Sequence, residues 1–287
     1  MTTPAALTTA SDGGRNSSRT DEQRDVFAFL STPDAYGLRG GVIERIDTHI
    51  SIVWLVGDRA YKLKRTVHYD YVDVSTIERR RLACEAEVEL KRRTAPSLYR
   101  GVLPVTREAD GSLALAGRGV PVDWLVEMER FDQDTLFDRL ADQNQLDIEP
   151  MEALADAIAR LHSGAERHTA RGGRLGMAWV IDGNALGFSE QGAGVLDLAI
   201  CERVTAGTRH ALDRDAELLD ARRRGGFVRR CHGDLHLRNI CLVNGVPTLF
   251  DGVEFNDDIS CIDVLYDLAF LLMTCGGAIS VPTPTRF

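Results

Sequence analysis

The segment CHGDLHLRNICLVNGVPTLFDGVEF, residues 231–255, constrains the fold more than any other part of the chain. Its apolar runs, residues 240–243 and 248–250, predict a β-hairpin of two buried strands. Polar residues flank the runs, because Asn239 directly precedes the first and Asp251 directly follows the second. A hairpin brings its outer ends together, so we expect Asn239 and Asp251 to lie close to each other, beside Asp234.

The spacing of these polar residues is typical of a loop that transfers phosphoryl groups. Asp-x-x-x-x-Asn, with His232 two positions before Asp234, matches the kinase catalytic loop H-R-D-x-x-x-x-N. In such a loop the Asp orients or deprotonates the attacking hydroxyl, and the Asn supplies a neutral oxygen to Mg²⁺. Asp251 stands where the Asp of a DFG segment would be, and Mg²⁺ prefers hard oxygen ligands. The pattern therefore predicts Asp234 as the base, with Asn239 and Asp251 as metal ligands.

Two other interpretations of this segment stay open. An isolated HGD is an ordinary turn in most proteins, in which the Asp only caps backbone groups. Alternatively, His232, Asp234 and His236 alternate, and on a strand they would share one face, as in a metal-dependent hydrolase. Zinc sites need further ligands, and the remaining histidines form no paired motif, so we favour the phosphotransferase interpretation.

A kinase-type site also requires a Lys on a strand and a Glu on the helix that follows. The run DRAYKLKR supplies Lys62, with Lys64 as the alternative on the same side of the strand. The predicted helix 75–93 offers four candidates for the acid: Glu78, Glu85, Glu87 and Glu89. We expect Glu85 to pair with the lysine, because its apolar neighbours, such as Val88, suit an inward-facing position.

Recognition of the nucleotide is less clearly encoded. The chain contains neither G-x-G-x-x-G nor G-x-x-x-x-G-K-[ST]. The turn DTHIS, residues 47–51, is expected to cap phosphates through backbone N–H groups and the hydroxyls of Thr48 and Ser51, with an ordinary hairpin as the alternative. The strand LVEMERF leads into helices, so we expect the backbone of Glu127 and Met128 to hydrogen-bond an adenine edge.

The order of the patterns predicts an α+β chain of two lobes. After a disordered tail, residues 1–22, we expect a small, mainly antiparallel β lobe with one helix over residues 23–127. A mainly helical lobe follows over residues 128–273, and an irregular tail over residues 274–287. Within the helical lobe, the Gly-rich residues 164–195 are hard to assign.

Composition narrows the range of partners. The net charge of -9 argues against nucleic acid and anionic membranes as partners. The apolar run VLYDLAFLLM is too short for a bilayer and contains Asp267, so we expect no membrane span. No leader opens the sequence, and the six cysteines are scattered without a CxxC pair. These features predict a cytoplasmic protein with reduced thiols.

The motifs together resemble the aminoglycoside phosphotransferase family over roughly residues 25–273. The resemblance is carried by CHGDLHLRNICL, LFDGVEF, DVLYDLAFLLM, AYKLKR, ERRRLACEAEVELKRR and LADAIARLH. It implies a protein-kinase-like fold, ATP (with GTP as the alternative) and Mg²⁺ as cofactors, and a small hydroxylated acceptor. By matched position, Asp234 would be the base and Lys62 the phosphate lysine, and His232 would shape the loop. Asp263 and Asp267 would be structural, bonding to the loop or capping a helix.

The sequence departs from that family in two places. In Asp-Gly-Val, residues 251–253, the usual larger residue after the Asp is missing, which leaves the local packing open. The chain looks most like the phosphotransferase half of bacterial bifunctional proteins that carry a fused C-terminal P-loop kinase-like domain. No apolar period follows DLAFLLM, so we expect an incomplete lobe from about residue 274, with uncovered apolar faces on helices 150–163 and 261–273. The alternative function is then a truncated, non-catalytic nucleotide-binding remnant.

Overall fold

An antiparallel sheet and a group of helices form separate units of the chain. The computed structural model describes residues 23–69, 71–192 and 194–278, so the expected tail at residues 1–22 lies outside the described part. The N-terminal unit contains the described residues up to Glu89 together with Pro96–Arg130, and the C-terminal unit contains Leu90–Ala95 and the described residues from Phe131 onward. The division falls three residues after the expected lobe boundary at residue 127.

The N-terminal unit is built on a six-stranded sheet with the order β1-β2-β3-β8-β6-β7. All neighbouring strands pair antiparallel. The strands are β1 (Glu44–Asp47), β2 (Ser51–Val56), β3 (Arg59–Lys64), β6 (Tyr99–Arg107), β7 (Leu113–Leu115) and β8 (Val120–Glu129). Gly57, with φ 56°, makes the tight turn between β2 and β3 in a conformation that glycine adopts without strain. A second hairpin joins β6 to β7 through residues 108–112.

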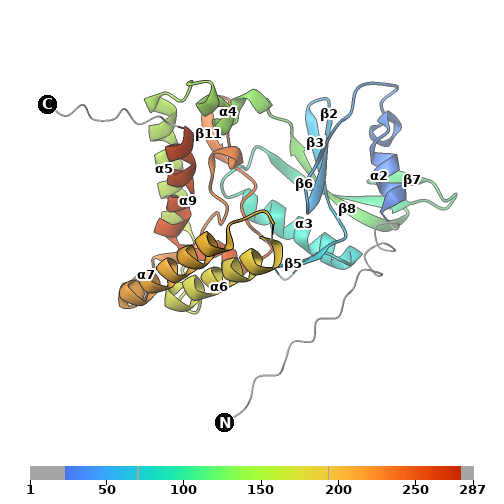
Figure 1. Ribbon diagram of the computed structural model, residues 1–287. Coiled ribbons are helices and arrows are strands. Elements are labelled where there is room, and N and C mark those ends of the chain that lie inside the picture. Colours follow the sequence, from blue (N-terminus) through green and yellow to red (C-terminus); the bar gives the residue numbers. More distant parts are fainter. Residues whose placement is uncertain (1–22, 70, 193, 279–287) are drawn as a thin grey trace, which may run out of the picture. The chain divides into compact units, whose positions relative to one another are not determined.

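Helices pack on this sheet through apolar side chains. The remaining elements of the unit are α2 (Arg24–Leu30), η1 (Pro33–Tyr36), the pair β4 (His68–Tyr69) and β5 (Val72–Asp73), and α3 (Ile77–Lys91). Leu30 of α2 lies in one apolar cluster with Trp54 and Leu125 of the sheet. Figure 1 shows α3 running beside the sheet. The buried thiol of Cys84 on α3 donates to the carbonyl of Trp124 in β8 at 3.8 Å.

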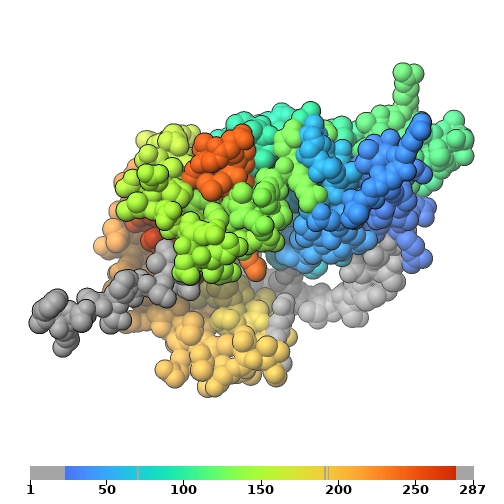
Figure 2. Space-filling view, turned by 90° about the horizontal axis from the view of Figure 1, so that it is seen from above, coloured from blue at the N-terminus to red at the C-terminus, as the bar shows by residue number. Residues whose placement is uncertain are grey.

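The C-terminal unit is mainly helical. Its elements are η2 (Gln133–Thr135), α4 (Phe137–Asp142), α5 (Ile148–Gly164), α6 (Gly173–Gln191), α7 (Leu198–Arg224), β9 (Val228–Arg230), η3 (Leu237–Asn239), β10 (Ile240–Val243), β11 (Val246–Leu249), α8 (Asp257–Ser260), β12 (Cys261–Asp263) and α9 (Val264–Ala278). Phe137, Leu154, Leu235 and Leu249 share its apolar core, which joins α4, α5 and the β10–β11 hairpin. Figure 2 shows the orange hairpin bordered by the yellow-green helices. The α+β organisation predicted from the sequence is thus confirmed.

The Gly-rich residues 164–195, for which the sequence predicted no element, contain a long helix. α6 runs back along α7, and the two helices lie side by side (Figure 1). Residues 198–224 form a single helix, which begins where the Asp197 carboxylate accepts hydrogen bonds from the N–H groups of Ala199 and Ile200. Mutual packing of α6 and α7 compensates for the low helix propensity of the glycines in α6.

Helices α5 and α9 each correct one expectation. Helix α9 continues to Ala278, so residues 274–278 are helical and not part of an irregular tail. Leu154 and Ile158 of α5 are buried, so the expectation of an uncovered face on that helix was wrong. On α9, by contrast, Leu272 and Met273 are 60% and 68% exposed. No helix within the described residues is both long and apolar enough to cross a membrane.

Candidate active site

The β10–β11 hairpin brings together the chain ends that carry the predicted metal ligands. Ile240 pairs with Leu249, and the N–H of Phe250 donates to the carbonyl of Asn239 at 3.0 Å. Asn239 and Asp251 therefore lie at the same open end of the hairpin, as the sequence predicted. The backbone of Asp251 has φ 55°, a left-handed conformation that a non-glycine residue adopts at a cost of order 1 kcal/mol or more.

Asn239 is hydrogen-bonded to the predicted base. Its Nδ2 donates to both the carbonyl oxygen and Oδ2 of Asp234, each at 2.9 Å. These bonds fix the orientation of the amide, because a nitrogen must face the two acceptors. The oxygen Oδ1 is then the atom of this side chain that remains to hold a cation. Asn239 is only 7% exposed, so the surrounding residues hold its side chain in place.

The surroundings of Asp234 favour its ionised form. Burial on its own raises the pKa of Asp234, but hydrogen bonds from His236 and Asn239 and the charge of His236 outweigh this effect. The net result is a pKa below the usual range for Asp. His236 Nε2 lies 3.3 Å from Oδ1 of Asp234. A carboxylate that is ionised at neutral pH can accept a proton or orient a hydroxyl donor.

His232 connects the loop to the segment that follows the hairpin. Its Nε2 lies 3.0 Å from the carbonyl of Phe250, and its own carbonyl accepts from the N–H of Val253 at 2.7 Å. The residue is 5% exposed, and burial lowers the pKa of its ring, so the imidazole is neutral at pH 7. His232 is thus a positioning residue, in keeping with the expected role of shaping the loop.

Glycines at two positions allow this close packing. A Cβ on Gly252 would lie 2.7 Å from the carbonyl oxygen of His232 and 3.2 Å from its Cγ. Gly233 has φ +79°, and a Cβ there would meet Val253 at 3.1 Å and the Cα of Ser260 at 3.2 Å. The small residue after Asp251 is therefore required, because a larger side chain would collide with the His232 backbone.

A buried ion pair holds the same segment and was not foreseen from the sequence. Lys91, at the end of α3, reaches Glu254 at 2.6 Å and also donates to the carbonyl of Gly252. Both side chains of the pair are about 95% buried, at 5% and 4% exposure. Removal of either partner would leave an uncompensated charge in the interior.

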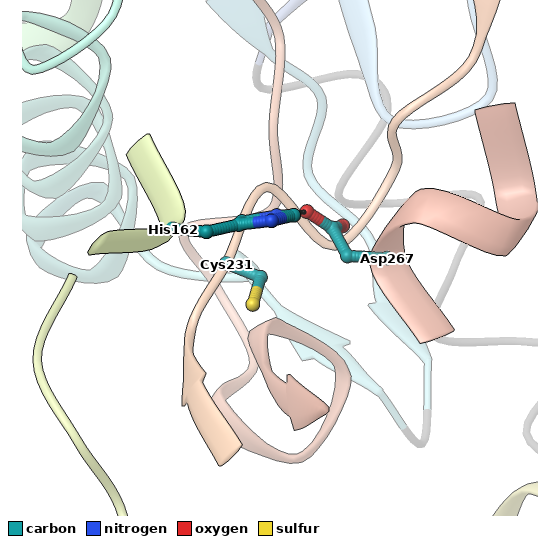
Figure 3. A group of neighbouring side chains, drawn as sticks. All are labelled: His162, Cys231 and Asp267. Atoms are coloured by element: carbon teal, nitrogen blue, oxygen red, sulfur yellow. Dashed lines mark hydrogen bonds and ion pairs between the residues drawn. The ribbon is translucent and has the colours of Figure 1, made fainter. Parts of the chain in front are cut away.

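Residues of α5 and α9 anchor the catalytic loop. Asp267 of α9 accepts hydrogen bonds from the N–H groups of His232 and Gly233, at 3.2 and 2.9 Å. His162 of α5 meets the same carboxylate at 2.8 Å, and Figure 3 shows the two side chains in contact with Cys231 beside them. Asp263 accepts from the N–H of Leu265 at 2.9 Å and so caps α9. The expected structural roles of Asp263 and Asp267 are both confirmed.

The cluster of His162, Cys231 and Asp267 also has the composition of a metal site. Ligand atoms of these residues lie within 4.8 Å of one another. Burial raises the pKa of the Cys231 thiol well above its usual value, so a metal ion would have to displace the thiol proton in order to bind. Asp267 is already engaged by His162 and by the loop backbone. We interpret the cluster as an anchor of the loop.

Metal-dependent hydrolysis was the other functional interpretation of this loop. It requires that the side chains of His232, Asp234 and His236 share one face of a strand. The structure places them in an irregular loop, where the buried His232 ring bonds to Phe250 and His236 approaches Asp234. Among the described residues, the metal-ligating side chains that cluster are those of His162, Cys231 and Asp267, and not these three. The geometry does not support metal-dependent hydrolysis at this loop.

In the N-terminal unit, the strand lysines meet a buried glutamate. Lys62 and Lys64 of β3 lie 2.9 and 2.6 Å from the carboxylate oxygens of Glu87, which has no exposed surface. The prediction that Glu85 pairs with the strand lysine was wrong. Glu85 faces solvent and pairs with Arg81, one turn earlier on the helix, at 2.7 Å. Glu87 lies next to Val88 on the buried side of α3.

The turn at residues 47–51, which was expected to cap phosphates, has the geometry of an ordinary hairpin. The hydroxyl of Thr48 accepts from the N–H of Ser51 at 2.9 Å and donates to its carbonyl at 3.0 Å. Ser51 is 4% exposed. The hydroxyl of Thr48 is thus used within the turn, and the hairpin alternative fits these two residues better than phosphate capping.

The predicted adenine contacts are also at odds with the sheet. Glu127 and Met128 belong to β8, which pairs with β3 on one side and with β6 on the other. A strand paired on both sides uses its backbone N–H and C=O groups in the sheet. The chain leaves β8 only after Glu129, so neither residue lies outside the sheet.

Comparison with known proteins identifies the family. A family model described as the phosphotransferase enzyme family matches residues 128–284, more than half of the chain. The chain belongs to this family. Family membership confirms the coarser part of the resemblance noted from the motifs, whereas the acceptor and the kinship to one half of a bifunctional protein stay predictions.

Some proteins similar to this phosphotransferase are considerably longer than the chain, and others are low in sequence identity to it. Uncharacterized proteins of Mycobacterium tuberculosis and Mycobacterium bovis are 30% identical over 234 residues, which are 79% of this chain and 44% of theirs. The chain thus spans less than half the length of these curated relatives.

Two solved structures of similar fold are more remote in sequence. One is an aminoglycoside phosphotransferase from Streptomyces rimosus, with 20% identity, 88% and 83% of the two chains covered, and a TM-score of 0.46. The other is a choline/ethanolamine kinase family protein from Mesorhizobium loti, with 16% identity, 91% and 72% covered, and a TM-score of 0.43.

Proposed function

We propose that the chain is an ATP- and Mg²⁺-dependent phosphotransferase that acts on a hydroxyl of a small molecule. The observation that carries the proposal is the Asp234–Asn239 hydrogen-bonded pair at the open end of a hairpin that continues into Asp251. A base, an amide oxygen and a second carboxylate at one hairpin end are the parts that phosphoryl transfer to an alcohol requires.

Each residue has a distinct role in this proposal. The Asn239 amide oxygen and the Asp251 carboxylate are hard oxygen donors of the kind that Mg²⁺ prefers, and they would hold the ion. When bound, Mg²⁺ supplies charge neutralisation at the phosphate oxygens. Lys62, held by Glu87, would bind phosphates of ATP, with GTP as the alternative nucleotide. The ionised Asp234 would orient the acceptor hydroxyl and take its proton as the new P–O bond forms and the bond to ADP breaks.

The remaining expectations on partners and location belong to the proposal. All six cysteines lie in the described residues and none forms a disulfide, which supports a cytoplasmic protein with reduced thiols. The acceptor would be a hydroxylated small molecule and not a nucleic acid, given the net charge of -9. Relatives about twice as long leave room for the fused P-loop domain that the resemblance implies.

The test is turnover of ATP against a panel of hydroxylated metabolites, with Mg²⁺ present or chelated. Asp234→Asn is expected to lower turnover by ~10²–10⁴, as for loss of a positioned base. Full activity in that variant would contradict the assigned role. Stabilisation of the chain by Mg-ATP without turnover of any alcohol would instead favour the alternative of a non-catalytic nucleotide-binding remnant.

A further inference from the structure

A pocket opens in the C-terminal unit beside the loop that carries Asp234. Its volume is about 240 Å³, and its walls come from α6, α8, β12 and α9. Gly233, the residue before Asp234, and the loop anchor Asp267 both line it. A molecule in this pocket therefore lies against the loop to which the proposed base belongs.

The walls of the pocket are largely apolar and aromatic. Trp179 of α6 and Phe270 of α9 line it, with 48% and 38% of their surfaces exposed, and Ile262 is part of the wall. The rings of Tyr266 and Phe270 meet edge to face at a centroid distance of 6.5 Å. Exposed aromatic faces around a cavity favour a flat apolar ligand, because stacking and burial both stabilise it.

A few polar groups at the same pocket can orient a ligand. They are the indole N–H of Trp179, the amide of Asn184 and the phenol of Tyr266. The side chains of these residues form no hydrogen bond with any other described residue. Burial raises the pKa of Tyr266, so its phenol stays protonated as a donor. A small number of polar groups in an apolar pocket is typical of sites that bind organic molecules.

The acidic residues of the pocket are already neutralised. Asp258 is paired with Arg171, and Asp267 is engaged by His162 and by the loop backbone. Asp182, next to the lining residue Gly183, pairs with Arg209 at 2.8 Å. A polycation would have to compete with these existing partners for each carboxylate, which makes the pocket less suited to it than to a neutral ligand.

We propose that this pocket binds the acceptor and that the acceptor is a flat, largely apolar aromatic alcohol and not a polycation. The assignment as acceptor site rests on the phosphotransferase function proposed above. The binding of such alcohols follows from the walls of the pocket alone and needs no nucleotide.

Helix α6 offers a matched pair of variants to test the proposal. Gly183 lines the pocket, and Gly187 lies one turn further on the same helix outside the lining. An added Cβ meets nothing within 4 Å at either position, so both tolerate a leucine without a clash at Cβ. Gly183→Leu fills part of the pocket, whereas Gly187→Leu controls for the change in helix propensity.

The experiment measures binding of 2-naphthylmethanol to the full chain by ligand-observed NMR, without ATP. We expect equal affinity for the unmodified chain and Gly187→Leu, at least tenfold weaker binding for Gly183→Leu and Trp179→Ala, and no displacement of the probe by kanamycin. Unchanged affinity in both pocket variants, or displacement by kanamycin, would overturn the proposal.

Phosphoryl transfer is then assayed separately, by mass spectrometry of the phosphate ester after addition of Mg-ATP. Ester formation that Gly183→Leu suppresses supports the acceptor assignment. Specific binding without transfer to any alcohol would refute the proposed function but leave the ligand class intact. Transfer to polycationic alcohols in preference to the aromatic probe would retain the function and refute the acceptor assignment.

Discussion

Lys62 and Glu87 are joined by a 2.9 Å hydrogen bond in the interior of the N-terminal unit. We expect Glu87→Gln to lower kcat/KM for ATP by ~10²-fold, because a neutral amide holds the ammonium group less firmly and the lysine loses its orientation. Steady-state kinetics at varied ATP measures the effect.

The control for this prediction is a second glutamate of the same helix. Glu85→Gln removes only the exposed contact with Arg81, so kcat/KM should change by less than about twofold. Equal losses in the two variants would show that α3 responds to any change of charge and not to the loss of the lysine partner.

The hydrogen bonds around Asp234 predict the pH dependence of the reaction. The pKa of Asp234 lies below its usual value, so the carboxylate stays ionised as the pH falls from 7 until it passes below the usual Asp value of about 3.9. His236→Ala removes a partner that lowers this pKa, while burial, which raises it, remains. The acid limb of the profile of kcat/KM against pH should therefore move to higher pH.

The matched variant for that profile is His210→Ala, at an exposed position of α7. It removes an imidazole from the chain but leaves the loop intact, so its acid limb should coincide with that of the unmodified chain. A common shift in both histidine variants would mean that net charge, and not the contact with Asp234, sets the profile.

Close packing at Gly252 predicts a cost in stability. Gly252→Ala puts a methyl group 2.7 Å from the carbonyl oxygen of His232, so the free energy of unfolding should fall by ~1–3 kcal/mol, as for overpacking in a dense interior. Chemical denaturation measures the change. Gly176→Ala, in open space on α6, should instead raise stability by about 0.5–1 kcal/mol. Changes in unfolding free energy of the same sign and size in the two variants would contradict the packing argument.

The hairpin and its flanking residues could be predicted because their signals are local. Apolar runs of strand length, bounded by polar residues, determine that Asn239 and Asp251 share one end of the hairpin. The same holds for Lys62 and Lys64, since alternation along β3 places both on the side that meets Glu87.

The sequence did not reveal that Glu87 is the partner of the lysines, and it did not reveal helix α6. The physical reasons differ. α3 is only weakly amphipathic, because Leu82 is 51% exposed whereas Glu87 is fully buried, so apolar neighbours did not reveal its inward face. In α6, glycines hid a helix that depends on tertiary packing against α7. Ion pairs such as Lys91 with Glu254 join residues 163 positions apart and leave no local signal.

The anchor formed by His162, Cys231 and Asp267 can be distinguished from a metal site by removing each ligand. As an anchor, Asp267→Ala deprives the N–H groups of His232 and Gly233 of their acceptor, at ~1–3 kcal/mol of unfolding free energy for each. Cys231→Ala removes one small buried group and should cost only about 1 kcal/mol. A zinc chelator should leave the Tm of the unmodified chain unchanged. Stoichiometric zinc, lost together with thermal stability on chelation and absent from Cys231→Ala, would assign the cluster to a metal and not to the loop.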